Sequence, residues 1–178
     1  MEQNTIVMSF EELNRSLKRI TYEIIERNKG VNNLVLVGIK RRGVPLANII
    51  KDNIKTIENV DVPVCSLDIT FYRDDLSKQN DEPKVNNLDL NLDLSNKTVV
   101  LVDDVIYTGR TVRAAMDALL NYSRPSFIQL AVVVDRGHRE LPIRPDFVCK
   151  NVPTSKDEHI NVCVKEYDNE ECVYLIKK

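Results

Sequence analysis

The sequence lacks the paired cysteines that crosslink small secreted proteins and the long apolar runs that span a membrane. Its four cysteines form no CxxC pair, and no stretch approaches the roughly 18 apolar residues that a membrane span requires. No basic segment followed by an apolar run stands near the N-terminus. We therefore expect a cytoplasmic protein, neither secreted nor integral to a membrane, without a zinc site and with reduced thiols at Cys65, Cys149, Cys163 and Cys172.

The composition is that of one soluble globular domain. Of the 178 residues, 43% are hydrophobic and 29% charged, and a chain of this length buries roughly 70% of its unfolded surface without needing disulfides. The formal net charge of −2 hides a strong segregation. Residues 15–42 hold eight basic and two acidic side chains, whereas residues 61–93 hold three basic and eight acidic ones. A basic surface can therefore coexist with a near-neutral total.

Strand and helix patterns alternate along the chain. Ser9 and Glu12 have the spacing of a capping box, and apolar residues then recur at helical period until Gly30. Further helical patterns cover Val44–Ile54 and the segment that starts at Val112. Short apolar runs rich in β-branched residues predict buried strands at Leu34–Val37, Val62–Ile69, Thr98–Val102 and Phe127–Val134. This alternation predicts an α/β fold with a parallel, doubly wound sheet and right-handed crossovers.

A long polar stretch, residues 70–87, interrupts this alternation. Loops of this length usually serve a function. After it, leucines at 88, 90, 92 and 94 alternate with Asp or Asn. The alternation favours an extended, half-exposed strand, which would form an arm or hairpin beside the main sheet.

The segment VVLVDDVIYTGRT, from Val99 to Thr111, joins a buried strand, two acids and a small polar turn that opens a helix. Ligands of open parallel sheets bind outside the carboxyl ends of the strands, where helix N-termini present unpaired N–H groups. The turn Thr108–Thr111 is therefore expected to cradle a phosphate, with Gly109 allowing close approach of the backbone. Neither a Walker-type P-loop nor a GxGxxG fingerprint occurs.

Asp103 and Asp104 supply acidic groups at this strand end. Consecutive residues of a regular strand point to opposite faces, so only a bend lets both carboxylates meet one ligand. Ionised carboxylates accept hydrogen bonds from a ribose diol and favour positive charge that develops at a nearby sugar carbon. An acidic pair alone is most often a solvated strand end. Between the apolar run and the TGRT turn, it indicates a site for a phosphorylated ribose.

These thirteen residues resemble the phosphoribosyl-diphosphate motif of type I phosphoribosyltransferases. The resemblance implies displacement of pyrophosphate from the anomeric carbon of phosphoribosyl diphosphate. It places the acidic pair, as catalytic residues, on the ribose hydroxyls and the TGRT turn on the 5′-phosphate. It also implies Mg²⁺ held mainly by the oxygens of the substrate, so we assign no metal ligand in the protein. The implied binding residues are Val99, Val100, Leu101, Val102, Asp103, Asp104, Val105, Ile106, Tyr107, Thr108, Gly109, Arg110 and Thr111.

Further segments narrow the resemblance to PyrR, the family of bifunctional pyrimidine operon attenuators and uracil phosphoribosyltransferases. They are ERNKG (26–30), GIKRRG (38–43), DITFYRDDLSK (68–78), NDEP (80–83), DRGHRELPIRPDF (135–147) and NVPTSK (151–156). The C-terminal tail after about residue 160 resembles this family least. The resemblance implies one domain over residues 1–178, with a lid loop and arm at about 70–97 and a hood at about 136–160. It also implies a homodimer or higher oligomer.

The GIKRRG segment directly follows the first predicted strand. Gly38 and Gly43 would let Lys40, Arg41 and the local N–H groups close on a highly charged anion. Alone, the segment could equally be a basic turn between strand and helix. The family resemblance makes it the pyrophosphate loop, in which we expect a cis peptide between Lys40 and Arg41.

The resemblance also gives roles to the long polar stretch and to the hood. The stretch becomes a lid that shields a cationic sugar from water, with Tyr72 and the catalytic residue Arg73 on the pyrophosphate side. An exposed charged loop is the alternative. Backbone amides and carbonyls of the hood would match the polar edge of uracil. The implied uracil-binding residues are Arg136, Val152, Pro153 and Thr154.

Basic residues gather on one side of the first predicted helix, opposite its apolar stripe. By composition alone, such a face is usually just solvated. The resemblance implies binding of the structured leader mRNA of pyrimidine genes, strengthened by UMP or UTP, and promotion of transcription termination. The implied RNA-binding residues are Arg15, Lys18, Arg19, Tyr22, His138, Arg139, Arg144 and Lys150. Two alternatives stay open: an RNA-binding regulator with little turnover, and a type I phosphoribosyltransferase for another base without an RNA role.

Overall fold

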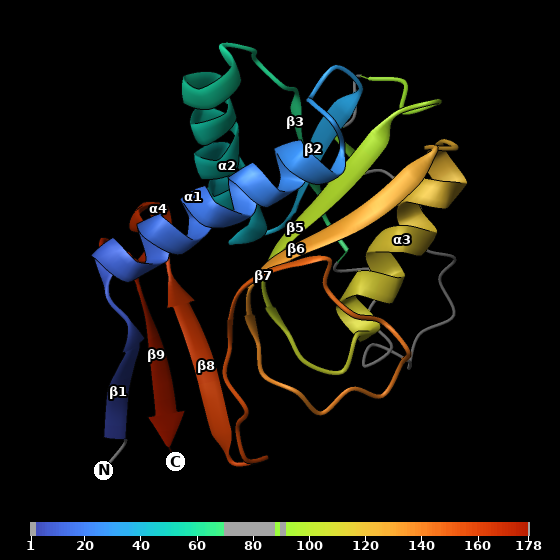
Figure 1. The fold of residues 1–178 in the computed structure, drawn as a ribbon. Coiled ribbons are helices and arrows are strands. Elements are labelled where there is room, and N and C mark those ends of the chain that lie inside the picture. The colour runs from blue at the N-terminus through green and yellow to red at the C-terminus, as the bar shows by residue number, and fades with distance from the viewer. Residues whose placement is uncertain (1–2, 70–87, 90–91, 178) are drawn as a thin grey trace.

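The computed structural model describes residues 3–69, 88–89 and 92–177. Its helices are α1 (Phe10–Arg27), α2 (Gly43–Glu58), α3 (Arg110–Tyr122) and α4 (Lys165–Asp168). Its strands are β1 (Gln3–Met8), β2 (Leu34–Ile39), β3 (Val64–Leu67), β4 (Leu88–Asp89), β5 (Thr98–Ile106), β6 (Phe127–Asp135), β7 (Phe147–Asn151), β8 (Glu158–Cys163) and β9 (Cys172–Lys177). In this part of the chain the strands form two sheets, ordered β4-β3-β2-β5-β6-β7 and β1-β9-β8 (Figure 1).

The larger sheet confirms the predicted α/β architecture. Strands β3, β2, β5, β6 and β7 are all parallel to their neighbours, and β4 is an antiparallel addition at the β3 edge. Every residue of β2 is buried, as expected for a strand that is covered on both faces. Because all five parallel strands end on the same edge, the loops that follow them gather there.

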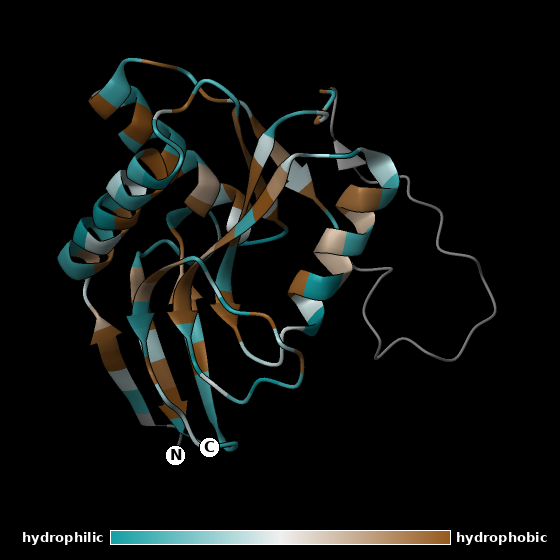
Figure 2. Cartoon of the chain, turned by 45° about the vertical axis from the view of Figure 1, so that its right-hand side comes forward, coloured by the Kyte–Doolittle hydropathy of each residue, from teal (hydrophilic) through white to brown (hydrophobic). Residues whose placement is uncertain are grey.

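Helices cover both faces of this sheet. Helices α1 and α2 pack on one face, in a core with Leu36 and Val100, whereas α3 packs on the other face with Val37 and Leu101. The alternation follows from the period of two along a strand. Figure 2 shows hydrophobic and hydrophilic bands alternating along the helices, as expected when one side of each faces the core.

The capping box at the start of α1 is present as predicted. The Ser9 hydroxyl accepts the Glu12 N–H at 3.3 Å, and the Glu12 carboxylate accepts the Ser9 N–H at 2.8 Å. This exchange satisfies two backbone donors that the first turn of a helix leaves unpaired. No helix of the described residues is long and apolar enough to span a membrane.

Some boundaries differ from the prediction. Strand β5 continues through the acidic pair to Ile106 and stays paired with β6, whereas the prediction ended it at Val102. Beyond the polar stretch, the described strand is limited to β4, so Leu92 and Leu94 lie outside any strand. Leu94 is instead fully buried in the core beside α3.

The smaller sheet was not predicted at all. It joins the two ends of the chain, because β1 pairs antiparallel with β9, and β9 pairs antiparallel with β8 (Figure 1). Helix α4 lies in the connection between β8 and β9. The predicted hood and domain boundaries stay predictions.

Two glycines allow the loop between β2 and α2 to pack tightly. A Cβ at Gly43 would lie 2.3 Å from the carbonyl oxygen of Val102, and a Cβ at Gly38 would lie 2.6 Å from Cα of Val44. Both distances are too short for any side chain. The loop therefore depends on Gly43 for its close approach to β5 and on Gly38 for its close approach to the start of α2.

We expect Gly43→Ala to lower the free energy of unfolding by about 1–3 kcal/mol, because an added methyl group forces the loop away from β5. Urea unfolding measures this change. Asn48→Ala, at an exposed position of the same helix, is the matched control and should change the free energy by less than about 0.5 kcal/mol. Equal stability of the two variants would contradict the tight contact.

Candidate functional site

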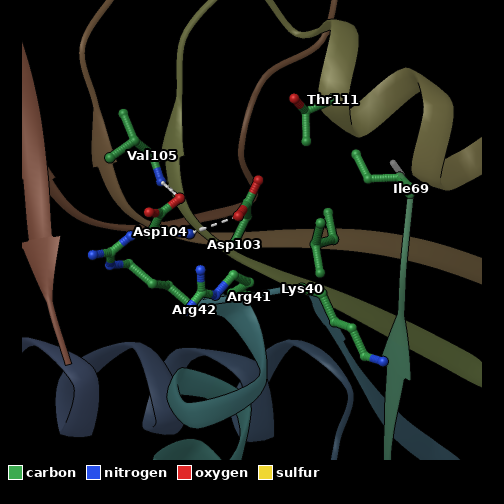
Figure 3. A pocket seen from close by; sticks show the side chains of 9 residues that line it. Lys40, Arg41, Arg42, Ile69, Asp103, Asp104, Val105 and Thr111 are labelled. Carbon is green, nitrogen blue, oxygen red and sulfur yellow. Dashed lines mark hydrogen bonds between the residues drawn. The ribbon is translucent and has the colours of Figure 1, made fainter. Parts of the chain in front are cut away.

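A cavity of about 340 Å³ opens where β2, β3 and β5 end. Its walls combine a basic loop, an acidic pair and the first turn of α3 (Figure 3). The lining residues are Ile39, Lys40, Arg41, Arg42, Ile69, Asp103, Asp104, Val105 and Thr111. The structure therefore brings together three groups of residues that the sequence predicted to share one ligand.

Both carboxylates of the acidic pair line this cavity, although the strand does not end before them. Each is fixed by the next backbone N–H: Asp103 Oδ1 accepts from Asp104 N at 2.9 Å, and Asp104 Oδ1 accepts from Val105 N at 2.7 Å. Figure 3 shows the Asp103 carboxylate directed toward the side of Thr111 and the Asp104 carboxylate directed toward Arg42. Both residues therefore line one cavity without the expected end of the strand before them, and their contact with a common ligand stays a prediction.

The basic wall consists of three consecutive cations, Lys40, Arg41 and Arg42. The peptide between Lys40 and Arg41 is cis, as expected. Sequence reasoning named Lys40 and Arg41 but missed Arg42, which lines the same cavity. Burial works against the charge of Arg42, yet the carboxylates of Asp168 and Asp104 raise the pKa of its guanidinium. The cavity thus holds opposite charges on facing walls, which suits a ligand with both hydroxyl and diphosphate groups.

The TGRT turn begins α3 with Gly109 in the left-handed region at φ 94°. Thr108 Oγ1 accepts the N–H of Arg110, and the Thr108 carbonyl accepts the N–H of Glu140 at 2.9 Å. The turn is therefore supported by the loop that follows β6. Within the motif, Thr111 reaches the cavity, while Val99 to Val102 are buried strand residues that position the acidic pair.

Arg136 connects the end of β6 to the predicted hood. Its side chain is buried and donates to Thr154 Oγ1 at 3.0 Å and to the carbonyls of Ser155 at 3.2 Å and Glu158 at 2.8 Å. Its guanidinium also lies 4.1 Å from the centre of the Tyr107 ring. Arg136 therefore supports both the hood and the end of the motif. The uracil contacts of Arg136 and of Val152 to Thr154 stay predictions.

The predicted RNA-binding residues lie around two hollows beside β7. Arg15, Arg19 and Lys150 line a hollow of about 420 Å³. His138, Arg139 and Arg144 line another of about 580 Å³. Lys18 and Tyr22 are exposed on α1 but line neither hollow.

Some of these side chains also make contacts within the protein. Arg19 donates to the carbonyls of Val148 and Cys149, and Lys150 donates to the Val7 carbonyl at 2.9 Å. Arg139 forms an ion pair with Asp135 at 2.6 Å. Of the basic residues on α1, Arg15 and Lys18 are therefore the ones whose charge is best placed for solvent or an external phosphate.

All four cysteines are free and buried, as predicted for reduced thiols. Antiparallel pairing of β8 with β9 nevertheless places Cys163 opposite Cys172, and their sulfur atoms lie with a carboxylate oxygen of Glu170 within 4.8 Å of one another. Local sequence spacing could not show this neighbourhood. Burial, with Cys172 nearby, raises the pKa of the Cys163 thiol to about 12, so this thiol stays neutral.

The predicted lid residues Tyr72 and Arg73 lie outside the described residues. The catalytic role of Arg73 stays a prediction. The cavity formed by the acidic pair, the basic loop and the TGRT turn is therefore the part of the site that the structure describes.

The fold and this cavity together define a type I phosphoribosyltransferase. The family model of the phosphoribosyl transferase domain matches residues 9–169. Among solved structures, the hypoxanthine phosphoribosyltransferase of Staphylococcus aureus superposes with a TM-score of 0.73 at 18% identity, covering 97% of this chain and 91% of that one. The enzyme of the same name from Trypanosoma cruzi gives 0.74 at 18% identity, covering 97% and 96%. These two likenesses concern the fold alone.

Curated relatives narrow the family. The Bifunctional protein PyrR of Caldicellulosiruptor bescii is 56% identical over 175 residues, which cover 98% of this chain and 96% of the relative. The protein of the same name from Clostridium beijerinckii is 54% identical over the full length of both chains. The chain therefore belongs to the phosphoribosyltransferases and, within them, to the PyrR family.

We expect Arg136→Gln to lower the free energy of unfolding by about 2–4 kcal/mol, because it leaves several backbone and hydroxyl acceptors without their charged donor. Hydrogen exchange should also become faster at residues 152–158. Arg144→Gln is the matched control, because Arg144 is exposed in the same loop. Unchanged exchange in the hood of Arg136→Gln would show that Arg136 does not hold it.

Proposed function

We propose that the protein is a uracil phosphoribosyltransferase that also acts as a uridine-nucleotide-dependent, RNA-binding attenuator of pyrimidine gene transcription. The observation that carries the enzymatic part is the single cavity in which the acidic pair faces the basic loop. Membership in the PyrR family at 56% identity supports the combination of the two activities. In the proposed reaction, uracil and phosphoribosyl diphosphate give UMP and pyrophosphate.

The cavity suggests where each part of phosphoribosyl diphosphate binds. The 5′-phosphate would accept hydrogen bonds from backbone N–H groups at the start of α3 and from the Thr108 and Thr111 hydroxyls. The ribose hydroxyls would donate to the carboxylates of Asp103 and Asp104. The diphosphate would lie against the cations at positions 40–42, whose charge stabilises it as it leaves.

The reaction forms a bond between the anomeric carbon and N1 of uracil while the bond to the pyrophosphate oxygen breaks. Positive charge develops on the sugar as the leaving group departs, and the two carboxylates stabilise that charge. The proton on N1 is lost to solvent or to the departing pyrophosphate. Uracil would enter from the side of Arg136 and the hood, where backbone groups of residues 152–154 offer donors and acceptors to its edge.

The cavity also fits the Mg²⁺ that accompanies such a substrate. Two carboxylates on one wall provide oxygen atoms of the kind that Mg²⁺ prefers, although each already accepts a backbone N–H. Bound mainly through the substrate's oxygens, Mg²⁺ would neutralise part of the diphosphate charge. We propose no direct metal ligand from the protein.

The RNA-binding role is linked to the same cavity. A nucleotide that prefers the RNA-competent state must raise RNA affinity by the same factor that RNA raises nucleotide affinity. Phosphate contacts from the basic residues around the two hollows would supply much of the affinity, and unpaired bases would supply the sequence recognition. We further propose a cytoplasmic homodimer or higher oligomer.

For the enzymatic activity, we expect release of pyrophosphate with uracil and not with orotate, guanine or adenine. Asp103→Asn and Asp104→Asn should each lower kcat/KM by roughly 100-fold or more, because the charge that stabilises the transition state is lost. Asp117→Asn, exposed on α3, should keep full activity. Turnover with a purine instead of uracil would favour a transferase for another base, and no turnover would leave an RNA-binding regulator.

For the RNA-binding activity, we expect Arg15→Gln to weaken binding of the leader RNA while uracil turnover stays unchanged. Removing one phosphate contact should also lower the slope of log affinity against log salt by roughly 0.7–0.9. Arg124→Gln, at an exposed position just after the end of α3, is the control. Unchanged RNA affinity of Arg15→Gln over a salt series would exclude this face as the binding surface.

A further inference from the structure

The C-terminal segment that resembles the PyrR family least, after about residue 160, lies against the basic loop of the cavity. Helix α4, in the connection between β8 and β9, presents Tyr167 and Asp168 to two consecutive arginines of that loop. The guanidinium of Arg41 lies 4.7 Å from the centre of the Tyr167 ring. Arg42 Nη2 lies 2.9 Å from Asp168 Oδ1. Two separate contacts therefore join the same four-residue helix to the same loop.

Both oxygens of the Asp168 carboxylate have a defined role. Oδ1 accepts from Arg42, and Oδ2 accepts the backbone N–H of Val164 at 2.9 Å, at the start of α4. Burial opposes ionisation of Asp168, but the Val164 N–H and the Arg42 guanidinium more than compensate, so the pKa is lower than usual. Asp168 is therefore a fixed anion rather than a mobile surface charge.

Arg42 is held between this anion and the acidic pair. Figure 3 shows its guanidinium turned toward the Asp104 carboxylate, and Asp104 also raises the pKa of Arg42. Its Nε–H is buried and finds no acceptor among the described residues. An unpaired buried donor of this kind is costly, so Arg42 is kept in this position by its contacts with the carboxylates around it.

We propose that Asp168 and Tyr167 are positioning residues for the diphosphate, acting through Arg42 and Arg41 respectively. This inference rests on the proposed function, because it takes the loop at positions 40–42 to bind the leaving group. The smaller sheet, which was absent from the sequence prediction, thereby becomes part of the active site. It fixes α4, and α4 fixes the arginines.

The physical reason is preorganisation. A free arginine loses much rotamer freedom when it binds an anion, whereas an arginine already held by a carboxylate and a ring has lost that freedom on folding. The planar guanidinium can donate to Asp168 on one side and still present its remaining N–H groups to a ligand. Removing the carboxylate should therefore weaken diphosphate binding, even though it removes a negative charge near an anion site.

The direction of this effect separates the proposal from simple electrostatics. If Asp168 only added negative charge, Asp168→Asn would strengthen the binding of pyrophosphate. If α4 only stabilised the fold, the same change would weaken all ligands alike. UMP is the discriminating ligand, because it carries the base and the 5′-phosphate but no diphosphate.

The test is calorimetric titration of the full chain with Mg²⁺-pyrophosphate and, separately, with UMP. For Asp168→Asn we expect the Kd for pyrophosphate to rise about tenfold, the size of one lost charge-assisted hydrogen bond. For Tyr167→Leu we expect a rise of about threefold, as for an exposed cation–π contact. The Kd for UMP should stay within twofold in both variants. Glu166→Gln, an exposed position on the same helix, is the matched control.

A double-mutant cycle makes the proposal specific to Arg42. In the Arg42→Gln background, Asp168→Asn should cause no further loss of pyrophosphate affinity, because Asp168 acts through that side chain. Additive losses, unchanged or tighter pyrophosphate binding, or an equal loss of UMP affinity would each overturn the inference. A wild-type protein that binds UMP but not pyrophosphate would also overturn it. A wild-type protein that binds neither ligand would instead overturn the proposed function.

If Asp168→Asn does not fold, Asp168→Glu provides the second variant. It keeps the charge but lengthens the side chain, so it should retain the UMP affinity and lose part of the pyrophosphate affinity. Retention of both affinities in Asp168→Glu, together with unchanged affinities in Tyr167→Leu, would overturn the proposal.

Discussion

The contact between the basic loop and β5 is the constraint on which the site depends. Gly43 approaches the Val102 carbonyl so closely that a Cβ would lie 2.3 Å from it. Because Asp103 and Asp104 follow Val102 directly, this contact brings the basic loop and the two carboxylates to one cavity. The Arg42 guanidinium lies toward the Asp104 carboxylate. Here the backbone N–H groups of residues 104 and 105 hold the carboxylates on their own wall.

Side chains distant in sequence then support each wall of the cavity. Arg136 connects the end of β6 to the hood, and Asp168 connects the smaller sheet to Arg42. Both are charged residues that are at least partly buried and use several hydrogen bonds, so their positions are well defined. The same chain also presents exposed basic residues beside β7. The cavity and the exposed basic residues therefore lie on separate parts of the described chain.

Much of the architecture could be predicted because it is encoded locally. The capping box at Ser9, the apolar runs of the parallel strands and the turn at Gly109 are patterns of a few neighbouring residues. The basic turn between Gly38 and Gly43 was also recognised from its sequence, although the packing of these glycines against Val44 and Val102 was not predicted. These local patterns placed the acidic pair, the basic loop and the start of α3 at one edge of the sheet.

The rest of the structure depends on contacts that no local pattern contains. Strand β1 pairs with β9 at the opposite end of the chain, and Arg42 meets Asp168 across 126 positions of sequence. Cys163 and Cys172 became neighbours for the same reason. Sequence reasoning therefore missed the smaller sheet, the support of Arg42 and the contribution of α4.

A crystal structure of the wild-type protein with phosphoribosyl diphosphate and Mg²⁺ tests the central claim most directly. The account predicts the sugar hydroxyls at Asp103 and Asp104, the 5′-phosphate at the start of α3 and the diphosphate against Arg41 and Arg42. Density for the ligand in the hollow beside β7, or carboxylates turned away from the sugar, would contradict it.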